Sequence, residues 1–352
     1  MQIKSLLLFQ LIVLNVYAQN EQTVSPRNLI KEEKFVQING IEQWITIKGD
    51  STKPAVLFIH GGPGSPISPF DIAFKKWEED FIIIQWDQRG TGKTYGRNAP
   101  EELTPAYLKS NPLTIEQMSS DGIAVTEYLI KHLGKQKIIL FGTSWGSILG
   151  VEMARKKPEL FYAYIGHSQM VNPINSNLYA YKKVSKLSEI SRDTATINIL
   201  KKIGNPPYKT ARNAGQLMRI IKKYQQQRSV PAPDNWWETT TEYSSEKDFQ
   251  NRSEGDDYSF VYFAGDEGLG ISSMVANIDF MENAFIFQIP VYFIQGKEDI
   301  QTPIEINKKY YRKIIAPKKK FIELPKTDHG FNQSVVDTQF KIMTKYVKPL
   351  VQ

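Results

Sequence analysis

The chain has 352 residues, of which 41% are hydrophobic and 12% aromatic, so it can bury a substantial core as one large domain with an insertion. Its formal net charge is +7, but the lysines are scattered in small groups, which favours a solvated basic surface over a nucleic-acid site. The absence of cysteine excludes disulfides and thiolate metal sites, and it removes the residue that would carry a lipid.

The first 18 residues predict a secretory signal peptide. A lysine precedes an apolar stretch over residues 5–17, which ends at the small residue Ala18, after which we expect cleavage. Gln10 and Asn15 interrupt this stretch, which is shorter than the roughly 20 residues of a membrane-spanning helix. We therefore expect an exported protein, periplasmic or secreted, without a stable membrane anchor.

The next part of the chain predicts a loose leader followed by a β-hairpin. Residues 19–33 are polar and are assigned to the leader. Residues 35–38 and 41–47 alternate between apolar and polar side chains, and Asn39-Gly40 between them is typical of a tight hairpin turn. The core is therefore expected to begin with an antiparallel edge.

Two apolar runs then predict strands that are covered on both faces. Residues 54–59 lead into His60-Gly61-Gly62-Pro63-Gly64, where glycines allow the backbone to approach a ligand closely. The N–H of Gly62, or that of Gly61, is a candidate oxyanion donor. Residues 81–86 lead into Asp87-Gln88-Arg89-Gly90-Thr91-Gly92, in which we expect Asp87 and Arg89 to form a structural ion pair, with substrate binding as the alternative.

A third run, residues 137–141, leads into Gly142-Thr143-Ser144-Trp145-Gly146-Ser147, which has the Gly-x-Ser-x-Gly spacing of a nucleophile elbow. A sharp turn from strand to helix strains the central serine, and flanking glycines leave room for that turn. The free N–H groups at the start of the following helix point to where an oxyanion would form. The pattern predicts that Ser144 is a nucleophile, with a plain strand-to-helix turn as the alternative.

The alternation of strands and helices up to residue 170 predicts a mostly parallel sheet. Residues 171–288 differ, because they are rich in lysine and glutamine and contain helical patterns without short apolar strands. We expect this segment to be a helical cap inserted between two parts of one α/β core, residues 34–170 and 289–352. The sheet is expected to resume at residues 289–295.

A serine nucleophile needs a base, and the base needs a group that orients it. His329 is the candidate base among four histidines, because it follows the last predicted strand and can lie over the C-terminal edge of the sheet. Asp299 is the candidate orienting acid, since it follows a strand and gives the order serine, acid, histidine that is typical of such sheets. Glu298 and Asp328 are the neighbouring alternatives.

The three motifs that begin at His60, Asp87 and Gly142 resemble, in this order and at these separations, the α/β-hydrolase fold and specifically the proline iminopeptidase group. The resemblance covers roughly residues 34–168 and 289–348. It implies that Ser144 attacks the carbonyl of an N-terminal residue, classically proline, with His329 as base and Asp299 as its orienting acid.

The resemblance also implies a set of binding groups. The backbone N–H groups of Gly62 and Trp145 would be the oxyanion donors, and cap carboxylates would anchor the free amine of the substrate. Trp237 and Glu238 are the nearest match to the aromatic-plus-glutamate feature of the family's cap, and plain packing of a cap helix is the alternative for this pair.

These features predict an exported serine hydrolase that forms an acyl-enzyme, of the proline iminopeptidase type, acting on small peptides. A carboxylesterase or lactonase that uses the same three residues on esters is one alternative. A non-catalytic ligand-binding protein on the same fold is an alternative from another class. We expect neither a metal nor an organic cofactor, and no nucleic-acid partner.

Overall fold

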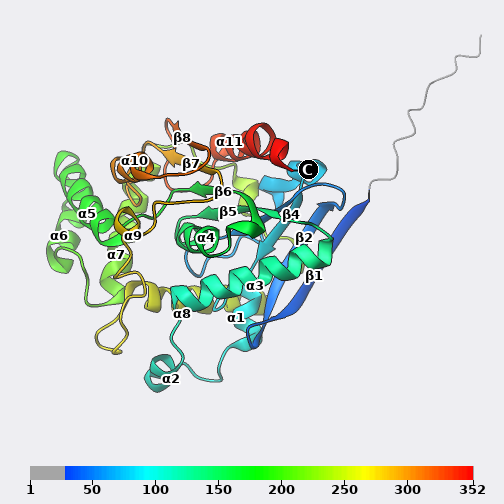
Figure 1. Ribbon diagram of the computed structural model, residues 1–352. Coiled ribbons are helices and arrows are strands. Elements are labelled where there is room, and N and C mark those ends of the chain that lie inside the picture. The colour runs from blue at the N-terminus through cyan, green and yellow to red at the C-terminus, as the bar shows by residue number, and fades with distance from the viewer. Residues whose placement is uncertain (1–27, 352) are drawn as a thin grey trace, which may run out of the picture.

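The computed structural model describes residues 28–351, and an eight-stranded sheet forms its centre (Figure 1). The strand order is β1-β2-β4-β3-β5-β6-β7-β8. β2 pairs antiparallel with both β1 and β4. The pairs from β4-β3 onward to β7-β8 are all parallel. The predicted fold class is therefore confirmed. The strands are β1 (Leu29–Ile38), β2 (Ile41–Asp50), β3 (Ala55–Ile59), β4 (Ile82–Trp86), β5 (Ile138–Thr143), β6 (Phe161–His167), β7 (Val291–Gly296) and β8 (Lys319–Leu324).

The antiparallel pair turns at Asn39 and Gly40, whose φ values of 45° and 86° are those that a two-residue hairpin turn requires. β1 begins at Leu29, so residues 29–33 belong to the sheet, and the predicted leader is wrong for this part. The polar composition of the segment reflects an edge strand, which faces solvent along one side. The predicted signal peptide and residues 19–27 of the leader lie outside the described residues.

Helices cover both faces of the parallel strands. β5 shows how the sequence achieves this, because Ile138 and Leu140 belong to one hydrophobic cluster and Ile139 and Phe141 belong to the other. The first cluster includes side chains of the helices α3 and α4, and the second includes side chains of the 3₁₀ helix η1 and of α11. The core helices are η1 (Ile72–Glu79), α1 (Gly92–Asn98), α2 (Pro105–Ser110), α3 (Ile115–Leu133), α4 (Trp145–Lys156), α10 (Ile304–Lys313) and α11 (Gln333–Ile342).

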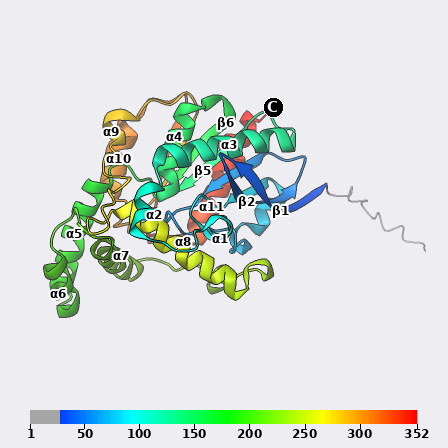
Figure 2. The same cartoon turned by 90° about the horizontal axis from the view of Figure 1, so that it is seen from below.

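The chain between β6 and β7 forms helices, as the pattern predicted for this segment. In both views α5, α6 and α7 lie together at one end of the molecule, and α8 runs from α7 towards α1 (Figures 1 and 2). The first three share a small core of their own, which also takes in Ile300 from the loop after β7. None of the helices in residues 28–351 combines the length and apolar content that a bilayer crossing requires. The helices of this segment are α5 (Pro173–Ile190), α6 (Thr194–Ile203), α7 (Ala211–Gln226), α8 (Glu246–Ala264) and α9 (Phe280–Asn283).

Candidate active site

Ser144 lies at the turn between β5 and α4. Its backbone has φ 51° and ψ −122°, a conformation that is strained for any residue with a side chain. The turn is tight because α4 packs on the end of β3, and a side chain at Gly146 would collide with the carbonyl oxygen of Ile59. The N–H of Ser144 donates to the carbonyl of His167 at 3.0 Å, which ties the elbow to the neighbouring strand. The predicted strand-to-helix elbow is therefore present.

His329 and Asp299 complete a chain of hydrogen bonds that begins at the serine hydroxyl. His329 Nε2 lies 2.8 Å from Ser144 Oγ, and His329 Nδ1 lies 3.0 Å from Asp299 Oδ2. A carboxylate can only accept, so Nδ1 carries the proton and Nε2 is free to accept from the serine. The three residues that the sequence singled out thus meet where β5, β7 and β8 end.

The carboxylate of Asp299 is buried and fully hydrogen-bonded. The backbone N–H of Thr302 donates to Oδ1 at 2.8 Å, and the Thr302 hydroxyl donates to Oδ2 at 2.6 Å. Gln295 Nε2 also donates to Oδ2, at 3.0 Å. Burial by itself would raise the pKa of Asp299, but the charge and hydrogen bond of His329 and the two hydrogen bonds from Thr302 lower it below its usual value.

The same pair sets the basicity of the imidazole. Burial by itself would lower the pKa of His329, but the charge and hydrogen bond of Asp299 outweigh burial and raise it above its usual value. The alternative acids are engaged elsewhere, because Glu298 pairs with Arg228 at 2.8 Å and Asp328 accepts from the N–H of Gly330 at 2.9 Å.

The glycine loop after β3 passes directly beside the serine. A side-chain carbon built on Gly61 would lie 3.2 Å from Ser144 Cβ, so only glycine leaves ordinary space there. Gly62 has φ 109°, a conformation that favours glycine. Of the two predicted oxyanion donors, Gly62 directly follows Gly61, which lies beside the serine, and Trp145 directly follows Ser144.

Gln88 joins the loops that follow β3, β4 and β5. Its Nε2 donates to the carbonyl of His60 at 2.9 Å, and its Oε1 accepts from the indole N–H of Trp145 at 2.9 Å. His60 Nδ1 donates to the carbonyl of Gly61 at 2.8 Å, and burial lowers the pKa of His60 to about 4. His60 is therefore neutral, and its hydrogen bond helps to hold the glycine loop in place.

The expected ion pair between Asp87 and Arg89 is wrong, because the two side chains point to different elements. Asp87 accepts from Ser68 Oγ and from the N–H of Lys93, and burial raises its pKa to about 6. Arg89 instead pairs with Asp121 on α3 at 2.7 Å. Each residue anchors a different neighbouring segment.

Two other histidines have structural partners. His167 is buried at the end of β6, where Nδ1 lies 3.0 Å from Thr143 Oγ1 and the ring packs against Phe331. Burial lowers the pKa of His167 to about 3. His132 pairs with Glu32 on the edge strand at 2.9 Å.

Trp237 and Glu238 lie at the surface, at the end of the short 3₁₀ turn η3 (Asp234–Trp237). The ring of Trp237 lies edge-on against Phe70 with ring centroids 5.7 Å apart, and it is 49% exposed. Trp236 beside it is buried against the cluster that contains α11. Glu238 is exposed at the end of this short turn, and its N–H donates to the carbonyl of Asn235.

A different acid lies against the glycine loop. A side chain on Gly64 would collide with the backbone of Asp256 on α8, and Ser65 Oγ donates to Asp256 Oδ1 at 3.1 Å. The Asp256 residue is exposed, and desolvation of its carboxyl group against the neighbouring loop raises its pKa above its usual value. The sequence patterns do not single out Asp256. Gly255 beside it is nevertheless a signal, because a glycine inside a helix often marks close packing.

Within residues 28–351, no three His, Asp or Glu side chains gather in a way that could hold a metal ion. The polar groups around Ser144 are instead engaged with one another, as donors and acceptors of proton-transfer chemistry.

Known proteins are similar to this chain in sequence and in fold. The chain matches the alpha/beta hydrolase fold family over residues 54–332. It is 30% identical over 309 residues to "Probable aminopeptidase YbaC" of Bacillus subtilis (strain 168), covering 84% of this chain and 90% of that protein. It is 27% identical over 196 residues to a proline iminopeptidase of Clostridioides difficile (strain 630), covering 54% of this chain and 60% of that protein.

A solved structure agrees at the level of the fold. The crystal structure of a proline iminopeptidase of Mycobacterium smegmatis has a TM-score of 0.61 to this chain at 14% identity, covering 91% of this chain and 97% of that one. The family match spans the elbow, the acid and the histidine, and the first of the relatives aligns over most of its own length. The chain therefore belongs to the α/β-hydrolase fold family, as a hydrolase of the proline iminopeptidase-like group.

Proposed function

We propose that this protein is a serine hydrolase in which Ser144, His329 and Asp299 form a catalytic triad. The 2.8 Å contact between His329 Nε2 and Ser144 Oγ carries this proposal. The imidazole takes the hydroxyl proton as the oxygen attacks a substrate carbonyl, and Asp299 stabilises the imidazolium that results. The imidazolium then gives its proton to the leaving group, and an acyl-enzyme remains on Ser144.

Hydrolysis of the acyl-enzyme repeats the sequence with water as the nucleophile. His329 removes a proton from water, the oxygen attacks the ester carbonyl, and the proton returns to Ser144 as the acyl group leaves. The backbone N–H groups of Gly62 and Trp145 would stabilise the oxyanion in both steps, because they belong to the segments that flank the serine. Neither step requires a metal or an organic cofactor.

We further propose that the substrates are small peptides with a free N-terminal amine. The names of the Bacillus subtilis and Clostridioides difficile relatives, an aminopeptidase and a proline iminopeptidase, support this substrate class. The location of Asp256 also supports it, since a carboxylate beside the glycine loop could bind an ammonium group near the scissile bond. Asp256 replaces Glu238 as our candidate for the amine anchor.

Asp256→Asn is expected to weaken recognition of the amine. We expect kcat/KM for free-amine arylamides to fall roughly 10- to 100-fold, since a charge-assisted hydrogen bond contributes about 1.5–3 kcal/mol. Hydrolysis of an acyl ester without an amine should stay within about twofold. Asp257→Asn, at the exposed neighbouring residue, is the matched control. Equal losses on both substrates would contradict an amine-binding role.

A substrate panel tests the choice between peptidase and esterase. Free-amine aminoacyl arylamides, the same compounds acetylated at the amine, and simple acyl esters should be compared on one preparation of the protein. An aminopeptidase loses activity when the amine is acetylated, whereas a carboxylesterase or lactonase does not distinguish the two forms. Absence of turnover and of labelling by a serine-directed phosphonate would favour a non-catalytic binding protein.

The pH profile should show the raised pKa of His329. The reaction needs the neutral imidazole, and a histidine whose pKa is raised stays protonated to a higher pH than a free one. We therefore expect kcat/KM to fall as the pH drops, with a midpoint above 6.5, the ordinary value. In Asp299→Asn the charge that raises this pKa is gone, so the midpoint should move to lower pH. A wild-type profile that stays flat down to pH about 5 would contradict His329 as the base.

A further inference from the structure

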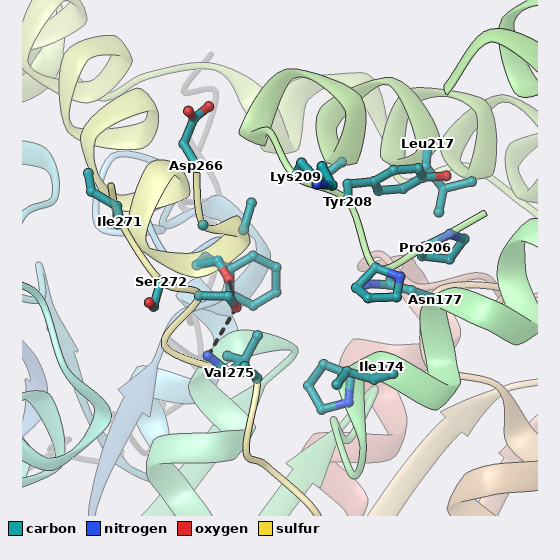
Figure 3. A pocket seen from close by; sticks show the side chains of 18 of the residues that line it. Ile174, Asn177, Pro206, Tyr208, Lys209, Leu217, Asp266, Ile271, Ser272 and Val275 are labelled. Carbon is teal, nitrogen blue, oxygen red and sulfur yellow. Dashed lines mark hydrogen bonds between the residues drawn. The ribbon is translucent and has the colours of Figure 1, made fainter. Parts of the chain in front are cut away.

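Residues 167–170, at the end of β6 and just beyond it, contact both a cavity of the inserted helices and the proposed triad. Met170 lines this cavity, which measures about 500 Å³ and lies between α5, α7 and the chain after α8 (Figure 3). Ser144 and His329 are not among the residues that line it, so the cavity makes no contact with the proposed reacting atoms. His167 and Ser168 instead contact the elbow and the loop that carries His329.

His167 is tied to the nucleophile elbow at two points. It is the register partner of Thr143 on the adjacent strand β5, and Thr143 Oγ1 lies 3.0 Å from His167 Nδ1. The carbonyl of His167 accepts from the N–H of Ser144 at 3.0 Å. Its ring also packs against Phe331, just after His329 in the chain, with ring centroids 5.3 Å apart. His167 therefore contacts both the strand that carries the nucleophile and the loop that carries the base.

Ser168 extends these contacts to the backbone of the base. Its hydroxyl donates to the carbonyl of His329 at 3.2 Å, and the same oxygen lies 3.3 Å from His167 Nε2. Its own N–H donates to the carbonyl of Ile294 on β7 at 3.1 Å, and its φ of 49° is strained for a residue with a side chain. His329 itself lies in the loop between β8 and α11, outside the strand ladder of the sheet. The Ser168 hydroxyl therefore helps to fix the backbone of the base.

The donors and acceptors of these contacts agree in one direction. A carbonyl can only accept, so the single proton of the Ser168 hydroxyl points to His329. The Ser168 oxygen must then accept from His167 Nε2, which therefore carries a proton. Burial lowers the pKa of His167 to about 3, so the ring is neutral and its Nδ1 accepts from the Thr143 hydroxyl. Both ring nitrogens and both hydroxyl protons are thus engaged.

We propose that Thr143, His167 and Ser168 form a second hydrogen-bond chain, separate from the triad, that positions His329 against Ser144. The inference rests on the proposed function, because it takes His329 to be the base. The triad joins the nucleophile and the base through their side chains, whereas this chain joins the residue before the nucleophile to the backbone of the base. All three act through His329, so they are positioning residues that preserve the short contact needed for proton transfer.

Ser168→Ala removes the hydroxyl that holds the backbone of His329. We expect kcat to fall roughly 10- to 100-fold with KM within about twofold, since a displacement of about 1 Å at a catalytic group can cost about 100-fold. Ser168→Gly should lose as much, although glycine suits the φ of 49° better than serine does. Ser188→Ala is the matched control, because Ser188 is also buried and its hydroxyl also donates to a backbone carbonyl, at 2.8 Å. A glycine variant with wild-type kcat would overturn the proposal, because only the backbone conformation would then matter.

Thr143→Val tests whether the three residues act as one chain. Valine has the shape of threonine without the hydroxyl, so we expect kcat to fall about fivefold, and Thr143→Ser should recover most of this loss. When Thr143→Val is combined with Ser168→Ala, kcat should match that of Ser168→Ala alone, because the chain is already broken. Thr126→Val is the matched control, at a buried threonine whose hydroxyl donates to a carbonyl within α3. Losses that multiply in the double variant would indicate separate local effects and would overturn the chain.

An NMR titration of His329 keeps the test independent of turnover. In the Ser144→Ala protein the pKa of His329 should lie above 6.5, because Asp299 contacts the ring. Ser168→Ala in this background loosens that contact, so the pKa should fall towards its ordinary value, whereas Ser188→Ala should leave it unchanged. The spectrum of a His329→Gln protein identifies the signal.

The titration also separates this proposal from the proposed reaction. A pKa of His329 that Ser168→Ala does not change would overturn the positioning role. A lowered pKa in the variant, together with a wild type that hydrolyses neither arylamides nor esters, would count against the proposed reaction and leave the positioning role supported.

Discussion

Ser144→Ala is expected to lower kcat by about a million-fold and to leave the fold unchanged. The size of this loss follows from the triad acting as a unit, in which removal of the nucleophile leaves the base and its acid without a reaction to assist. Alanine fits the turn because it is smaller than serine, and the backbone N–H that bonds to His167 remains. Steady-state rates on the best arylamide or ester, with circular dichroism as a check on folding, measure the effect.

Covalent labelling supplies an independent readout of the same residue. A serine-directed phosphonate should modify Ser144 in the wild type, and the labelling should disappear in Ser144→Ala and in His329→Ala. Ser253→Ala, an exposed serine on α8, is the matched control and should label normally. Retention of more than a tenth of wild-type activity in Ser144→Ala would exclude the assignment.

Asp299→Asn is expected to lower kcat by about ten-thousand-fold, although it changes a single atom of the side chain. Asp299 Oδ2 accepts hydrogen bonds from His329, Thr302 and Gln295. An asparagine NH₂ in that place would donate, so it would favour the imidazole tautomer whose Nε2 carries the proton. That tautomer cannot accept the proton of the serine.

The neighbouring acid provides the control for this prediction. Glu298→Gln removes a carboxylate one residue away that is paired with Arg228 and not with the imidazole, so kcat should stay within about twofold of wild type. Rate measurements on both purified variants decide between the two acids. Similar losses in the two variants would mean that Asp299 is not the orienting group.

The positions of the three central residues could be predicted because each lies in the turn or loop that follows a predicted strand. Parallel strands present their carboxyl ends at one edge of the sheet, so residues that follow different strands meet there even when they are distant in sequence. Ser144, Asp299 and His329 all have this placement. The Asn39-Gly40 turn was equally readable, because few residue pairs adopt its backbone conformation.

The supporting groups could not be predicted in the same way. Gln88 and Gln295 are buried amides whose roles depend on their hydrogen-bond partners. The spacing of apolar residues along a strand does not reveal those partners. Asp256 lies on a helix in the inserted segment, where no strand end fixes its position. The start of the edge strand β1 was predicted too late for a related reason. A polar strand looks like an unstructured leader in the sequence when the strand that it pairs with is unknown.

Ile300 gives the inserted helices a structural link to the catalytic acid. It follows Asp299 directly, its side chain is part of the core formed by α5, α6 and α7, and its N–H donates to Gln225 Oε1 on α7 at 3.3 Å. A chimera that takes these helices from a relative would therefore shift Asp299, unless the new helices also pack against Ile300 and accept its N–H. Substrate preference in this protein should be re-engineered by replacing side chains within the native helices, and wholesale exchange of the segment should cost activity on every substrate.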